Sequence, residues 1–144
     1  YPDVLDVTPL KADPLCLVAA PGVAGRLSSD QPLTRVTIPF VLPDPGQMWR
    51  QCLEAELFAP MGWHPEIGWV VNPVEAIKRF VREGLGVTIL PHHAVAEDLA
   101  AGHLVMATTA TPLPVPTIDM VRHRHRRAGR VLDAVWETLG SIGA

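Results

Sequence analysis

The sequence predicts an α/β fold in which helices cover both faces of a mixed, mostly parallel sheet. The first observation is residues 72–91, where a helical pattern, a two-glycine turn and an apolar strand pattern follow one another without interruption. The second is that short β-rich runs alternate with helical patterns along most of the chain, which is typical of helix-crossover connections. The third is composition, because 48% hydrophobic and 19% charged residues in a chain of 144 can support a buried core.

The first half of the chain is expected to contain two strands, a loop and a helix. Residues 15–19 are an apolar strand pattern, and the glycines and serines of residues 21–32 indicate a surface loop. Residues 36–42 form the next strand pattern, and the proline-rich residues 43–46 turn the chain. Apolar residues then recur at helical spacing over residues 49–57, and Pro60 is expected to end this helix.

The segment that follows is the most informative part of the chain. Residues 67–71 are predicted to form a strand. Asn72 is a favoured N-cap and Pro73 fits the first helical position. Gly84 can adopt the left-handed conformation that ends a helix. Residues 87–90 then form a nearly continuous apolar run, typical of a strand covered on both faces.

The remaining elements are a short helix, two strands and a closing helix. We expect the short helix over residues 94–101 and a weak strand over residues 104–107. The prolines of residues 112–116 indicate a linker, and residues 118–121 are a candidate strand. Apolar residues at helical spacing over residues 131–139 predict a closing amphipathic helix.

Charge and cysteine usage exclude several classes of protein. A net charge of -3 argues against a nucleic-acid surface over the whole chain. Five arginines between Arg122 and Arg130 could form a local nucleic-acid patch, but a strand end and solvated helix start is the preferred interpretation. Cys16 and Cys52 are expected to be reduced core residues. Without a signal-peptide pattern or a long apolar run, we predict a cytoplasmic protein and no membrane partner.

Metal and catalytic chemistry are not supported by the motifs. His92 and His93, and His123 with His125, lack the spacing of a metal site, so no metal and no cofactor are predicted. The sequence also contains no nucleophile elbow, phosphate loop or complete acid/base set. We therefore predict a protein that is not an enzyme.

Two predicted helix starts are candidates for ligand binding. In open α/β sheets, ligands bind at the carboxyl ends of strands, where helix N-termini present N–H groups that favour an anion. Simple turn and cap chemistry is the competing explanation for each start. The candidate residues are Gly46, Gln47 and Met48 at the first start, and Asn72, Pro73 and Val74 at the second.

Four segments also carry a family resemblance: residues 14–18 (PLCLV), 39–46 (PFVLPDPG), 74–91 (VEAIKRFVREGLGVTILP) and 121–124 (VRHR). In order and spacing they resemble the effector-binding domain of LysR-type transcriptional regulators. The resemblance implies a fold like the type 2 periplasmic binding proteins, with a small-molecule effector bound in a cleft between two α/β subdomains.

The resemblance also implies a division of the chain and its partners. A nearly complete second subdomain is expected over residues 17–107, and a partial first subdomain over residues 1–16 and 108–144. A winged helix-turn-helix domain that binds DNA is expected before Tyr1, in a homodimeric or homotetrameric regulator. The effector-contacting loops of the family fall on the two helix starts above, with Pro91 and His92 at their edge. Residues 22–27 depart from the pattern of the family.

The main hypothesis is thus an effector-sensing regulatory domain, in which a small and anionic metabolite shifts the population of two arrangements of the regulator. A stand-alone solute-binding protein of the same fold is the alternative. An enzyme built on the same lobes, using His92 or a nearby carboxylate, is a third possibility. The sequence does not identify the effector.

Overall fold

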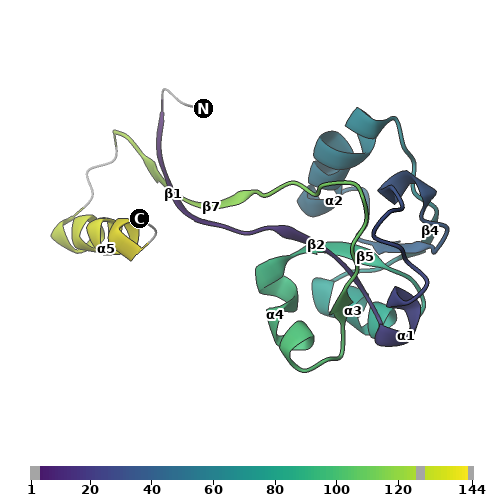
Figure 1. Ribbon diagram of the computed structural model, residues 1–144. Coiled ribbons are helices and arrows are strands. Elements are labelled where there is room, and N and C mark those ends of the chain that lie inside the picture. Colours follow the sequence, from purple (N-terminus) through teal and green to yellow (C-terminus); the bar gives the residue numbers. More distant parts are fainter. Residues whose placement is uncertain (1–3, 126–128, 143–144) are drawn as a thin grey trace. The chain divides into compact units, whose positions relative to one another are not determined.

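The computed structural model describes residues 4–125 and 129–142 of the chain (Figure 1). The chain divides into two compact units. The larger unit is Leu15–Pro114, and the smaller unit is formed by Tyr1–Pro14 together with Val115–Ala144. The larger unit is therefore a single continuous segment, whereas the smaller unit is made of two segments that are far apart in sequence.

The strands of the larger unit form a mixed sheet. These strands are β2 (Leu15–Ala19), β3 (Phe40–Leu42), β4 (Ile67–Val70), β5 (Thr88–Pro91) and β6 (Val105–Met106). Strand β3 is parallel to β4, and a parallel bridge between Phe40 and Val87 links β3 to the start of β5. Strand β2 pairs antiparallel with both β5 and β6. Four strands therefore run in one direction and β2 runs in the other, which confirms the mixed α/β class.

The reversal of β2 has a topological reason. Helical crossovers join β3 to β4, β4 to β5 and β5 to β6, and such connections return the chain in the same direction. No crossover of this kind leads from β2 into β3. The connection consists of α1 (Pro21–Ala24), a loop and a 3₁₀ turn (Leu33–Arg35). The predicted strand over residues 36–42 is correspondingly shorter, because only Phe40–Leu42 pairs.

The helices confirm most of the predicted elements, with one irregularity. Helix α2 (Met48–Leu53) continues into a π-helical turn (Glu54–Phe58) and a 3₁₀ turn (Ala59–Met61), so the predicted helix over residues 49–57 is not uniform. The next two helices are α3 (Val74–Arg82) and α4 (His92–Ala100).

Two glycines between α3 and β5 have different tasks. Gly84 has φ +75° and ends α3, with its N–H donating to Val81 O at 3.0 Å and the N–H of Leu85 donating to Phe80 O at 3.1 Å. Gly86 permits close approach, because a Cβ there would lie 2.4 Å from Pro39 O. The pattern Gly-Leu-Gly thus ends a helix and then brings the next strand against β3.

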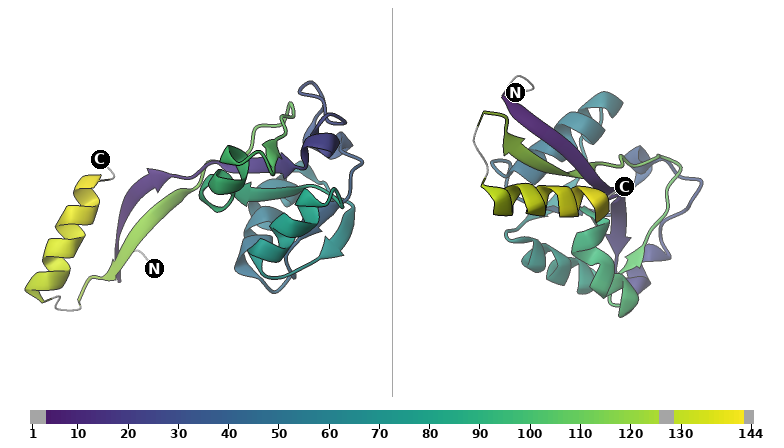
Figure 2. Two further views of the ribbon diagram at one scale, coloured as in Figure 1. Left: turned by 90° about the horizontal axis from the view of Figure 1, so that it is seen from below. Right: turned by 90° about the vertical axis from the view of Figure 1, so that its left-hand side faces the viewer.

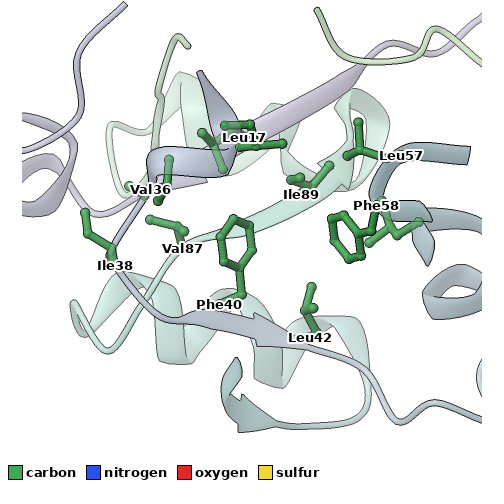
Figure 3. Packing of buried hydrophobic residues seen from close by; sticks show 12 residues of the cluster. Leu17, Val36, Ile38, Phe40, Leu42, Leu57, Phe58, Val87 and Ile89 are labelled. Atoms are coloured by element: carbon green, nitrogen blue, oxygen red, sulfur yellow. The ribbon is translucent and has the colours of Figure 1, made fainter. Parts of the chain in front are cut away.

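The central strands β2, β3 and β5 are buried on both faces, whereas the edge strand β4 is exposed along its length. Leu17 and Ala19 of β2 join one apolar cluster, and their neighbours Cys16 and Val18 join another. Figure 3 shows the first cluster, in which Phe40, Leu42 and Ile89 of the sheet face Leu57 and Phe58 of the π-helical turn. The second cluster contains Ile77, Val81 and Val95 from α3 and α4. The prediction of helices on both faces is confirmed. Neither Cys16 nor Cys52 is in a disulfide, but only Cys16 is buried, so the predicted core position was wrong for Cys52.

Within its described residues, the smaller unit is a two-stranded ribbon with one helix. Strand β1 (Leu5–Ala12) pairs antiparallel with β7 (Thr117–His123), and the closing helix is α5 (Arg130–Ile142) (Figure 2). Arg122 lies over the Trp136 ring, 4.4 Å from its centroid, and its Nη1 is 3.5 Å from Asp133 Oδ1. The sequence patterns did not predict β1, since Pro9 interrupts the run where the pairing register shifts.

The boundary of the larger unit lies within the predicted linker over residues 112–116. The N–H of Leu15 donates to Pro114 O at 3.2 Å, so the two ends of the larger unit are hydrogen-bonded to each other. In the smaller unit, the N–H of Asp13 donates to Pro116 O at 2.8 Å. Backbone pairing therefore continues through part of the segment that the prolines indicated as a linker.

Candidate functional site

The two predicted helix starts lie at one edge of the sheet. Strands β3 and β4 are adjacent and parallel, and each leads through a short loop into α2 or α3. The carboxyl ends of parallel neighbours meet at the same edge, which is where open α/β sheets bind ligands. A hydrogen bond between the loops supports this arrangement, because the N–H of Asp44 donates to Asn72 Oδ1 at 3.4 Å.

The loop before α2 is held by Asp44. Its carboxylate accepts a hydrogen bond from the N–H of Gly46 at 2.8 Å, and its carbonyl accepts one from the N–H of Gln47 at 2.9 Å. Gln47 is the N-cap of α2 and Met48 its first residue, and the Met48 side chain is 79% exposed. The main chain of Gly46, Gln47 and Met48 is thereby presented at the surface in a defined turn.

The loop before α3 corrects one prediction. Asn72 does not cap the helix, because Pro73 is the N-cap and no side-chain cap hydrogen bond is formed. The peptide bond between Asn72 and Pro73 is cis, and the Asn72 side chain turns to the Asp44 N–H instead. Asn72, which the pattern predicted as a local helix cap, therefore contacts a residue 28 positions away in the sequence. Val74 opens the helix and is 36% exposed.

Pro91 and His92 follow the strand β5. Pro91 is the last residue of β5 and the N-cap of α4, while His92 is the first residue of α4 and is exposed. Because β5 runs parallel to β3, its carboxyl end points to the same edge as the two loops above. Strand direction thus groups all eight predicted site residues at one edge of the sheet, whereas the hydrogen bond joins only the first two loops.

An ion cluster between α3 and α4 was missed by the sequence analysis. Asp98 is 3% exposed, its Oδ2 lies 2.9 Å from Lys78 Nζ, and its other oxygen pairs with Arg82 and lies 3.8 Å from His103 Nδ1. Lys78 Nζ also contacts Glu75 Oε1 at 2.7 Å and donates to Ala94 O at 3.0 Å. The helical pattern placed Lys78 on the solvated face of α3, and only the position of α4 reveals that it is buried. The cluster fixes α3 against α4. These are the helices that begin after the loop at Asn72 and directly after Pro91.

The arginines near the end of β7 pair with carboxylates where the structure describes them. Arg124 Nε lies 3.0 Å from Asp6 Oδ1, and Arg122 Nε lies 3.3 Å from Asp6 Oδ2. Hydrogen bonding from Arg124, followed by that from Arg122, lowers the pKa of Asp6 below its ordinary value. Arg126 and Arg127 lie outside the described residues, so the interpretation as a strand end with paired arginines is confirmed for the first two alone.

Among the described residues, three further concave surfaces are lined by none of the eight predicted site residues. One of about 640 Å³ is bordered by the loop from Ser28 to Thr37, and one of about 550 Å³ by the exposed face of α5. A third, of about 180 Å³, lies beside Arg50 and Trp63. Within the described residues, no three His, Cys, Asp or Glu side chains gather as a metal site would require, and no helix has the length and hydropathy to cross a membrane.

Comparisons with known proteins agree with the fold and identify a family. The model of the LysR substrate binding domain matches residues 1–142. The HTH-type transcriptional regulator BbuR of Bordetella bronchiseptica is 28% identical over 125 residues, which is 86% of this chain and 38% of BbuR. The chain thus spans well under half the length of that relative.

Solved structures show the same fold at low sequence identity. The CcmR regulatory domain from Synechocystis PCC6803 in complex with 2-PG has a TM-score of 0.83 at 18% identity, covering 96% of this chain and 67% of that one. The effector binding domain of QuiR in complex with shikimate has a TM-score of 0.78 at 19% identity, covering 99% of this chain and 66% of that one. Full-length HypT from Salmonella typhimurium has a TM-score of 0.71 at 18% identity, covering 96% of this chain and 46% of that one. From the match over nearly all of its residues, the chain belongs to the family of LysR substrate binding domains.

Proposed function

We propose that this chain senses a small effector for a LysR-type transcriptional regulator. The larger unit corresponds to the second effector-binding subdomain, which the sequence placed over residues 17–107, and the smaller unit to part of the first, placed over residues 1–16 and 108–144. In this proposal the chain acts in the cytoplasm, has no catalytic activity and requires no cofactor. DNA is bound by a winged helix-turn-helix domain of the longer regulator, which is a homodimer or homotetramer.

The effector is proposed to bind at the exposed loops before α2, α3 and α4. The contacting residues are Gly46, Gln47, Met48, Asn72, Pro73, Val74, Pro91 and His92. The observation that carries this proposal is the hydrogen bond from the Asp44 N–H to Asn72 Oδ1, because it ties two helix starts together at the carboxyl edge of parallel strands. Main-chain N–H groups at helix starts favour a carboxylate or phosphate group.

The regulatory mechanism is a shift of population. An effector changes how a regulator sits on DNA only if it binds one arrangement of the protein more tightly than another. Support for a small polar ligand comes from the two complexes of similar fold, whose ligands are 2-PG and shikimate. For this chain, the proposed effector is an anionic metabolite of comparable size.

Isothermal titration calorimetry with a panel of small organic acids that includes shikimate tests the proposal. We expect one acid to bind, and Gln47→Ala or Asn72→Ala to weaken it by about tenfold, because each removes a polar group at the site. Gln31→Ala is the matched control, since it removes an amide from a loop outside the site. Unchanged affinity in both site variants would eliminate these loops as the effector site. A tenfold preference for an acid over its amide supports the anionic effector.

A further inference from the structure

The smallest of the three concave surfaces has the chemistry of a ligand site. It has a volume of about 180 Å³ and lies in the larger unit beside α2 and the π-helical turn. Arg50, Glu54, Phe58, Ala59, Trp63 and His64 are among its lining residues. At about 30 Å³ for each water molecule, it has room for about six waters, which is the space of a single small ring with one substituent.

A buried guanidinium lines this cavity. Arg50 is 5% exposed, its Nε lies 2.7 Å from Glu54 Oε1, and its Nη1 donates to Pro43 O at a long 3.5 Å. These contacts use two of its five N–H groups within the described part of the chain. Glu54 is half exposed, so it is a weakly fixed partner for a charge that is costly to bury. A carboxylate in the cavity would complete the hydrogen bonds of the guanidinium in the planar, paired geometry that arginine prefers.

Another part of the lining is aromatic and is held by contacts with the core. The Trp63 ring packs edge-to-face against Phe58 at 5.4 Å and against Phe40 at 5.6 Å, and Phe40 is fully buried. Trp63 is therefore held by the core on two sides while it also lines the cavity. A flat ring with an exposed face or edge is the complement of such a wall.

We propose that this cavity is a second small-molecule site of the chain, which takes a small planar carboxylate. The carboxylate group pairs with Arg50, and the planar part packs against Phe58 and Trp63. This site is distinct from the proposed effector loops, because none of the eight effector-loop residues lines it.

The two sites are linked by Arg50 itself. Its Nη1 donates to Pro43 O, and the next residue, Asp44, donates its N–H to Asn72. A ligand that draws the guanidinium away from Pro43 releases one restraint on the loop before α2. By linkage, if a ligand at the second site changes the affinity of the effector loops by some factor, an effector at those loops changes the affinity of the second site by the same factor.

Titration of the chain with nicotinate tests the proposal, with nicotinamide as a neutral probe of the same shape. The indole N–H signals of the four tryptophans, followed by NMR, provide the readout, and a Trp63→Phe variant assigns the signal of Trp63. We expect nicotinate to shift the Trp63 signal and to bind about tenfold more tightly than nicotinamide, because only the acid pairs with Arg50.

Variants locate the site. Ala59→Leu fills the cavity without removing a polar contact and is expected to weaken nicotinate at least tenfold. Glu54→Gln removes the competing carboxylate and is expected to strengthen it about threefold. Gln31→Ala, outside both proposed sites, should leave nicotinate binding within about twofold.

The outcomes separate this proposal from the proposed function. Absence of nicotinate binding, equal binding of nicotinamide, or an unchanged affinity in Ala59→Leu would each overturn the second site. A loss of nicotinate binding in Gln31→Ala as large as that in Ala59→Leu would trace both losses to a general change of the fold and overturn it as well. The calorimetric test of the effector loops stands or fails independently of all these results.

Discussion

The two units of the molecule use similar apolar residues in opposite ways. In the larger unit, Val18, Phe40 and Ile89 are fully buried between two layers of helices and loops. In the smaller unit, Val7 and Val121 on the ribbon are about half exposed. A sheet covered on both faces can be stable by itself, whereas a two-stranded ribbon is marginal at best in water. The comparison teaches that stability is concentrated in residues 15–114.

Truncation of a core phenylalanine should show the difference in stability between the two units most clearly. We expect Phe40→Ala to lower the free energy of unfolding by about 3–5 kcal/mol, because it leaves a cavity between the sheet and the π-helical turn. The matched change in the smaller unit is Leu132→Ala in α5, where the side chain is exposed and the loss should stay within about 0.5 kcal/mol. Urea denaturation followed by circular dichroism measures both. Equal losses would refute the difference between the units.

Removal of the buried charge between α3 and α4 should be the next largest effect. Among the described residues, Asp98→Asn leaves the buried ammonium group of Lys78 with the exposed Glu75 as its one charged partner. We expect a loss of about 2–3 kcal/mol, somewhat below the usual cost of breaking a buried pair. Glu75→Gln is the control, since its carboxylate is exposed and should contribute below about 1 kcal/mol. Similar denaturation midpoints for the two variants would contradict the assignment of Asp98 as the centre of the cluster.

The glycine that ends α3 allows a smaller and more local test. Gly84→Ala forces a side chain into a backbone with φ +75° and should cost about 1 kcal/mol. Gly22→Ala is the control within the larger unit, because a Cβ there meets nothing within 4 Å and φ is not positive. Thermal unfolding should show a lower midpoint for the first variant only. A neutral Gly84→Ala would mean that helix α3 ends in another way.

The ion pairs of the smaller unit should give the smallest effect, and one that depends on pH. Arg124 and Arg122 lower the pKa of Asp6 in the folded chain. The stabilisation of the fold by these ion pairs is therefore fully present above the pKa of Asp6 in the unfolded chain, and it is lost as pH falls through the pKa of Asp6 in the folded chain. Arg124→Gln should therefore raise the pKa of Asp6, which carboxyl-detected NMR measures. Arg79→Gln, on the exposed face of α3, serves as the control. An unchanged pKa in Arg124→Gln would remove Arg124 as its main cause.

The same comparison shows how far sequence patterns reach. In the larger unit, apolar periodicity and glycines located the helix α3, the strand β5 and their turn, because these signals are local. The apolar face of α5 was equally visible, but a pattern does not say what covers it, and Val131 and Leu132 are exposed in the structure. Strand β1 was not predicted because Pro9 interrupts its short run and a proline argues against a strand.

The candidate site was predictable in position but not in detail. The turn and cap residues identified the loops at Gly46 and Asn72, since helix starts have a local signature. The contact between Asn72 and Asp44, the burial of Lys78 and the cavity beside Arg50 all depend on residues that are distant in sequence. Single-sequence patterns carry no information on such contacts, which is why the cap prediction for Asn72 was wrong.

The hydrogen bond between the Leu15 N–H and Pro114 O has an evolutionary consequence. It brings the first and last residues of the larger unit together, which makes this unit topologically an insertion into the smaller one. A segment with adjacent ends can be exchanged between genes, or circularly permuted, without rerouting its surroundings. If the proposed function holds, a new ligand specificity requires the replacement of residues 15–114 alone, while the rest of the chain is unchanged.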